Sequence, residues 1–180
     1  RKKNFDDELM GQLIRFVSSH EVGHTIGLRH NMGASSATPV EKLRDKEWVA
    51  KNGHTSSIMD YARFNYIAQP GDQNIRFIRK MGAYDHYALN WGYRVIPNAK
   101  SPESETPTLD KWILEKAGNP IYKFGKQSSA FDPTSQTEDI GNNSMKASSY
   151  ALKNLEYVAG HLSEWTSTAT NNYEDLDELY

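Results

Sequence analysis

One short stretch of the chain carries side chains that could hold a metal ion and act on water. His20 and His24 lie four residues apart, and Glu21 directly follows the first of them. On a helix such histidines are ~40° apart around the axis and about 6 Å apart along it, so both can reach one ion at the ~2.0–2.1 Å of a zinc–nitrogen bond. Glu21 then projects to one side of the pair, where its carboxylate can take a proton from a water that zinc has acidified.

His30 can supply a third ligand only if the helix ends before it. In a continuous helix His30 would lie roughly 120° from His24 and about 9 Å further along the axis. Gly27 lies between them, and glycine adopts the left-handed conformation that ends many helices without a Cβ clash. Three protein ligands leave a fourth position open, which is typical of catalytic rather than structural zinc sites.

The complete pattern, H-E-x-x-H-x-x-G-x-x-H over residues 20–30, arises by chance in about one chain of this size in 10⁵. This disfavours the alternative of an exposed helix end that merely carries histidines. The stretch resembles the active site of the metzincin zinc endopeptidases. The resemblance implies that His20, His24 and His30 bind Zn²⁺. It also implies that Glu21 acts as general base and then as general acid.

Metzincins also carry a Met-turn downstream of the histidine motif, and residues 57–61 (SIMDY) are its candidate here. The resemblance places Met59 beneath the zinc as a hydrophobic floor. Tyr61 matches the tyrosine that binds zinc or stabilises the oxyanion in the astacin-like and serralysin-like branches. Taken alone, Met59 would be interpreted as an ordinary core methionine.

The sequence around the motif looks most like a metzincin-type family of large exported proteins in Bacteroidetes-like bacteria. That likeness implies an extracytoplasmic protein, which is secreted, periplasmic or surface-attached. Only nineteen residues precede His20, whereas metzincins place a twisted sheet and a further helix there. We therefore expect a fragment whose missing N-terminal subdomain belongs to the remainder of the parent polypeptide and acts as its partner.

Composition sets outer limits on function. The net charge of −2 gives no reason to expect a nucleic-acid partner, and the absence of cysteine excludes disulfides and thiolate metal sites. No apolar run approaches the ~18–20 residues of a membrane span. There is no signal peptide, but the chain begins without Met, which suggests an excised piece.

Hydrophobic periodicity predicts a mainly α fold with long irregular loops and few strands. The resemblance to metzincins implies that these elements are the active-site helix plus the C-terminal subdomain of a metzincin-like (zincin) catalytic domain. In the first helix, Leu9, Leu13 and Val17 form a stripe that we expect to be buried. Thr38 and Glu41 read as a capping box for the second helix. The expected helices span residues 6–28, 39–51, 82–92, 109–117 and 143–165, with a further helix starting at 173–180.

The other segments lack helical spacing. Residues 61–73 read as a loop that either lines a substrate pocket or fills the core. Residues 97–107 read as a linker or a surface loop, 121–124 as a strand, 127–142 as irregular, and 171–172 as a break. We divide the chain into residues 1–96, the metzincin-like part, and residues 97–180, a helical extension packing on it.

Several other polar residues are of types that can bind metal ions. His54 could be a fourth ligand, but a solvated loop histidine is the favoured interpretation. Asp85 and His86 are read as structural, and His161 as a surface residue near a helix end. The acidic group of Asp132, Glu138 and Asp139 fits no calcium-loop spacing, which favours a solvated face.

The sequence therefore predicts a zinc-dependent endopeptidase that acts on a protein or peptide substrate. Two other classes stay open. One is a zinc hydrolase of a non-peptide amide or ester, and the other is a catalytically silent zinc-binding interaction module. Glu21 and Tyr61 argue against the silent module, since it would need neither.

Overall fold

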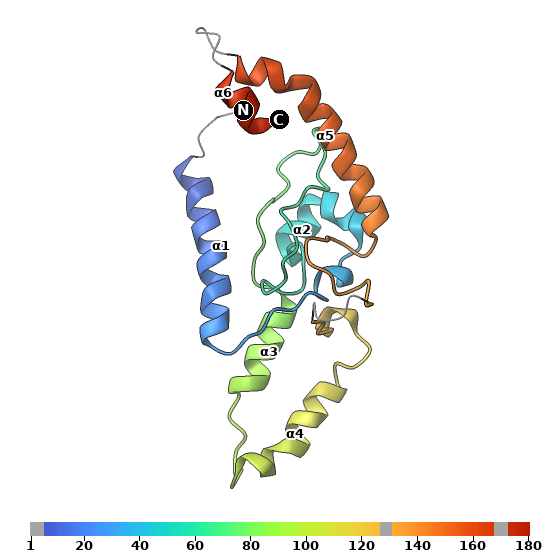
Figure 1. Cartoon of the computed structure of the whole chain (residues 1–180). Helices are drawn as coiled ribbons and strands as arrows, with labels where there is room; N and C mark the ends of the chain where they lie inside the picture. The colour runs from blue at the N-terminus through green and yellow to red at the C-terminus, as the bar shows by residue number, and fades with distance from the viewer. Residues whose placement is uncertain (1–5, 127–130, 168–172) are drawn as a thin grey trace.

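The computed structural model describes residues 6–126, 131–167 and 173–180, and within these ranges it contains helices and loops but no strand. The mainly α prediction is confirmed (Figure 1). The α-helices are α1 (Asp7–Thr25), α2 (Lys46–Asn52), α3 (Ala83–Tyr93), α4 (Pro102–Leu114), α5 (Ser144–Thr166) and α6 (Glu174–Leu179). Three short 3-10 helices are η1 (Ser35–Ala37), η2 (Val40–Arg44) and η3 (Pro120–Tyr122).

Local sequence chemistry accounts for both ends of helix α1. The Asp6 carboxylate accepts a hydrogen bond from the Leu9 amide at 2.9 Å and so caps the first turn. The helix ends at Thr25, three residues before the predicted end. Gly27 follows with φ of +91°, a left-handed conformation that a side chain would strain. The predicted turn at Gly27 is therefore confirmed, and it redirects the chain toward His30.

The predicted burial of the apolar stripe on α1 is wrong. Leu9 and Leu13 are only partly buried, and Val17 is 51% exposed. In α1 the buried residues are His20 and Gly23, both in its C-terminal half. Figure 1 shows that α1 runs along one edge of the molecule.

The second predicted helix is interrupted. Asp45 ends η2 and its carboxylate accepts from the Trp48 amide at 3.0 Å, which starts α2 afresh. Thr38 caps nothing, and Glu41 instead contacts Lys146 and Tyr150 of α5. The capping-box prediction is therefore wrong, because the Glu41 carboxylate binds side chains of the distant helix α5 instead.

Two predictions in the C-terminal half also fail. The supposed linker over residues 97–107 contains the start of α4, where Ser101 is the N-cap and Pro102 the first residue. Proline is tolerated in a first turn because its missing N–H would have no partner there. The predicted helix 109–117 is the end of α4, which stops at Leu114. The predicted strand 121–124 is replaced by η3, capped by the Asn119 side chain.

The core joins segments that are distant in sequence. Val40, Leu43, Ile67, Ile140 and Ala147 form one buried cluster, which brings η2, a central loop and the start of α5 together. Asn143 caps α5 as predicted, and residues 61–73 and 131–142 are irregular as predicted. Residues 127–130 of the expected irregular segment and the expected break at 171–172 lie outside the described residues. The division at residue 96 stays a prediction. No helix among the described residues is long and apolar enough to cross a membrane.

Candidate metal centre

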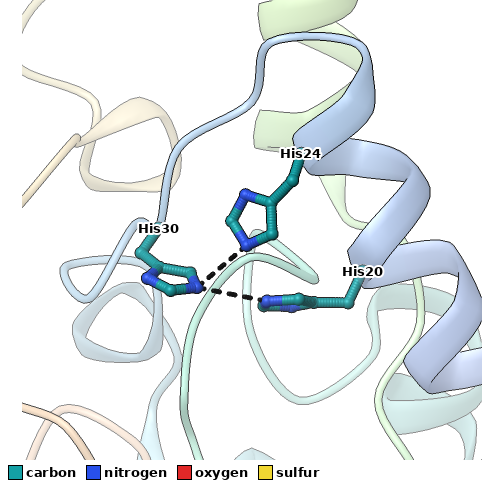
Figure 2. A group of neighbouring side chains, drawn as sticks. All are labelled: His20, His24 and His30. Carbon is teal, nitrogen blue, oxygen red and sulfur yellow. Dashed lines mark hydrogen bonds between the residues drawn. The ribbon is translucent and has the colours of Figure 1, made fainter.

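The structure brings the three histidines of the motif together (Figure 2). His20 and His24 project from α1, and His30 approaches from the loop after Gly27. The Nε2 atom of His30 lies 3.3 Å from Nε2 of His20 and 3.0 Å from Nε2 of His24. Each imidazole offers one ligand atom, and all three atoms lie within 4.8 Å of one another.

Backbone carbonyls fix the tautomers of the two helical histidines. Nδ1 of His20 lies 2.9 Å from the Ile58 carbonyl oxygen, and Nδ1 of His24 lies 2.9 Å from the Leu28 carbonyl oxygen. A carbonyl only accepts, so each Nδ1 carries the hydrogen and each Nε2 keeps a lone pair. Both lone pairs therefore point at the space beside His30.

This donor set fits a zinc ion. A hydrogen on Nε2 of His30 could pair with only one neighbouring lone pair, whereas one cation would engage all three nitrogens. Tetrahedral coordination with bonds of ~2.0–2.1 Å separates ligand nitrogens by about 3.3 Å, and the two Nε2 separations here are 3.3 and 3.0 Å. Carbonyl partners on Nδ1 are also what metal-bound histidines usually have.

Electrostatics favour the neutral, ligating form of His30. Burial lowers its pKa, and His24 and His20 lower it further by charge repulsion. Glu21 has the opposite effect on the pKa of His30, so its carboxylate is near enough to interact with the site. The side chain of Glu21 is itself exposed and is free to reach a substrate or a water.

Met59 lies against the turn of α1 that carries both histidines. It is fully buried, and a Cβ placed on Gly23 would approach its Sδ atom to 2.6 Å. Real side-chain atoms do not come so close, so a larger residue at position 23 would force the end of the Met59 side chain to shift. The Met59 carbonyl also accepts a hydrogen bond from the backbone N–H of Asn31 at 3.1 Å. This bond connects Met59 to the loop that carries His30.

Tyr61 lies beside His30 and His20. Its ring centroid is 4.3 Å from that of His30 and 5.6 Å from that of His20, and the residue is 39% exposed. The predicted residues of the motif and of the Met-turn thus gather at one place.

Asp85 of α3 holds the Met-turn in shape. Its buried carboxylate accepts hydrogen bonds from the Ser57 hydroxyl at 2.5 Å and from the amides of Ile58 and Gly82, both at 2.8 Å. Since the Ile58 carbonyl accepts from His20, a chain of contacts runs from α3 to a candidate ligand. This agrees with the structural role predicted for Asp85. The indirect contact with His20 could not be predicted from the sequence.

Two further residues near the site were missed by sequence reasoning. The side-chain amide of Asn31 donates to the Lys123 carbonyl at 2.9 Å and accepts from the backbone N–H of Gly125 at 3.0 Å. It therefore anchors the loop after His30. Arg79 donates to the Asp60 carbonyl, and its guanidinium lies 4.4 Å from the ring centre of Phe16 in α1. Both pairings join distant segments, which local patterns do not reveal.

Neither interpretation of His54 holds. The residue is fully buried, so it is not a solvated loop histidine, and it does not belong to the histidine cluster. Its Nε2 donates to the Arg76 carbonyl at 2.8 Å, while its Nδ1 has no hydrogen-bond partner within the described part of the chain. Burial lowers the pKa of His54 to about 4, and the nearby cations Arg79, Arg76 and Lys80 also lower it.

His54 should make folding stability depend on pH. A pKa lower in the folded state means that its contribution is fully present above pH 6.5 and is lost as the pH falls through about 4. We expect the wild type to lose about 2–4 kcal/mol over this window relative to His54→Gln. Urea unfolding at a series of pH values, in the presence of a chelator, measures the difference.

A second buried group, Asp60, also makes stability depend on pH, which is why the wild type is compared with His54→Gln. Burial raises its pKa to about 7, so its contribution is present at low pH and is lost as the pH rises, opposite to that of His54. Both proteins share Asp60, so its effect cancels in the difference. Equal pH dependence in the wild type and in His54→Gln would contradict the assignment.

The three acidic residues considered for calcium have separate partners. Asp132 pairs with Lys123, Glu138 pairs with Arg63, and Asp139 accepts from the Ser35 hydroxyl at 3.1 Å. These ion pairs and hydrogen bonds explain the acidic group without a cation.

Comparison with known proteins gives one match. The model of a protein family named DUF4953 and described as Met-zincin matches residues 2–180. No curated protein and no solved structure matches the chain.

Proposed function

The chain belongs to the Met-zincin family, and from this premise we propose that it is a zinc-dependent endopeptidase. The family membership suggests a metalloprotease. The observation that best supports the finer proposal is the convergence of three Nε2 atoms beside Glu21 at the end of one helix. A site with three imidazole ligands leaves room for a water and a substrate carbonyl.

In the proposed mechanism, His20, His24 and His30 would hold the ion. Bound zinc would supply Lewis acidity to the scissile carbonyl and to a water molecule. Glu21 then accepts the proton of the attacking water and returns it to the leaving amine. Tyr61 donates a hydrogen bond to the carbonyl oxygen as negative charge develops there.

Two further parts of the proposal concern context. The substrate is a protein or peptide, which is the class that a metallopeptidase family implies. We also propose an extracytoplasmic location and cooperation with the remainder of a parent polypeptide, on the basis of the motif resemblance alone.

The proposal is tested first by zinc content. Elemental analysis of tag-free protein should find about one zinc per chain, as expected for a single three-histidine site. His24→Ala should lose the metal, because His24 donates one of the three converging nitrogens. Cleavage of a peptide library, followed by mass spectrometry, should then be seen with the zinc-loaded wild type and abolished by a chelator.

A matched control is His161→Ala. That histidine lies on α5 and bonds to the carbonyl of Tyr157 in its own helix, so its variant should keep the metal. Equal zinc content in the wild type and His24→Ala would overturn the proposed site. Hydrolysis of small amides without any peptide cleavage would overturn the endopeptidase.

A further inference from the structure

A small pocket opens beside Tyr61, next to the histidine cluster. Its volume is about 170 Å³, which is room for one side chain of moderate size. The lining residues are Tyr61, Ala62, Arg63, Phe64, Arg79 and Glu138. Because the ring of Tyr61 lies 4.3 Å from that of His30, the pocket and the metal centre share a wall. A substrate residue adjoining the scissile bond is therefore within reach of the pocket, since successive residues of an extended peptide rise ~3.3 Å.

The charges of this pocket are unbalanced. Arg63 forms an ion pair with Glu138, and both side chains are largely exposed. Arg79 supplies a second guanidinium, which is partly buried and stacks on Phe16. The lining thus carries two guanidinium groups and one carboxylate.

Arg79 also keeps an unused donor. Its Nη1 donates to the Asp60 carbonyl, but its buried Nε has no hydrogen-bond partner among the described residues. The nearby Asp60 carboxylate accepts from the amides of Ser35 and Ala62 at 2.6 and 2.8 Å. Backbone donors thus already occupy the nearest buried carboxylate.

We propose that this pocket selects an acidic side chain, Asp or Glu, next to the scissile bond of a polypeptide substrate. The inference rests on the proposed peptidase function. Glu138 already places a carboxylate on Arg63, and a substrate carboxylate would take its place. Arginine binds carboxylates through two parallel hydrogen bonds, which gives geometric selection as well as attraction. Arg79 adds positive charge at the inner wall.

The test measures binding without turnover. Zinc-loaded Glu21→Ala is titrated with fluorescent peptides that differ at one position, which carries Glu, Gln or Lys, and the position is moved along both sides of the peptide centre. At one position we expect Glu to bind about fivefold or more tightly than Gln, with Lys weakest, because a partly exposed ion pair contributes roughly 1 kcal/mol.

Two added substitutions locate the effect. Arg63→Glu should abolish or reverse the preference for Glu, and Glu138→Gln should strengthen it, since it removes the competing carboxylate. Lys111→Glu changes the net charge as much as Arg63→Glu but lies on α4, outside the pocket, so it should leave the preference intact. Equal binding of the three peptides, or an unchanged preference in Arg63→Glu, would overturn the pocket assignment.

Cleavage of the same peptides by the wild type separates this inference from the proposed function. Cleavage without an acidic preference at any position would overturn the pocket and leave the peptidase standing. A preference for Glu in binding, without cleavage of any peptide, would support the pocket and overturn the peptidase.

Discussion

Replacing Glu21 by Gln should leave zinc bound and lower peptide turnover by at least about 10³-fold, within the range of a lost general base. Gln preserves the size of the side chain but cannot accept the proton of the attacking water. Zinc binding should survive, because the carbonyl contacts that orient His20 and His24 involve Ile58 and Leu28 and not Glu21.

The measurement is kcat/KM on a fluorogenic peptide, with zinc content determined on the same samples. Glu8→Gln is the matched control, since Glu8 lies in the first turn of the same helix, far along the chain from the histidines. Turnover within about tenfold of the wild type at equal zinc content would exclude Glu21 as the base, because smaller losses arise from indirect effects.

The sequence predicted the histidine cluster because its geometry is local. Helical spacing alone brings His20 beside His24, and a left-handed Gly27 is enough to return His30 to them. The cap of α5 by Asn143 is equally local, and it too is where the sequence placed it. Chemistry contained within one turn or one cap can be read without knowing the rest of the fold.

The features that the sequence did not predict depend on contacts between residues that are distant along the chain. Glu41 looked like part of a capping box, but Lys146 and Tyr150 lie 100 or more residues away and bind it instead. His54 was predicted to be a solvated loop residue, because nothing in the neighbouring sequence signals its burial or its hydrogen bond to the distant Arg76 carbonyl. The stripe on α1 shows the converse, since periodicity predicts an apolar face without saying whether anything covers it.

Substitution of Asp85, which supports the Met-turn, should have the second large effect. Asp85→Ala should lower the free energy of unfolding by about 3 kcal/mol or more, because it leaves three donors on Ser57, Ile58 and Gly82 without their acceptor. Zinc affinity should also fall about 10–100-fold, since Ile58 is the residue whose carbonyl orients His20.

Urea unfolding in chelator measures the loss of stability, and competition with a chromogenic chelator measures the affinity for zinc. Asp110→Ala removes an exposed carboxylate from α4 and should change neither quantity. Asp85→Asn should fall between the wild type and Asp85→Ala, because its amide keeps one acceptor oxygen but turns an N–H₂ group toward the remaining donors. If Asp85→Ala loses stability yet binds zinc as tightly as the wild type, the carboxylate secures the Met-turn to α3 without orienting His20. The chain of contacts from α3 to the metal centre would then carry no functional coupling.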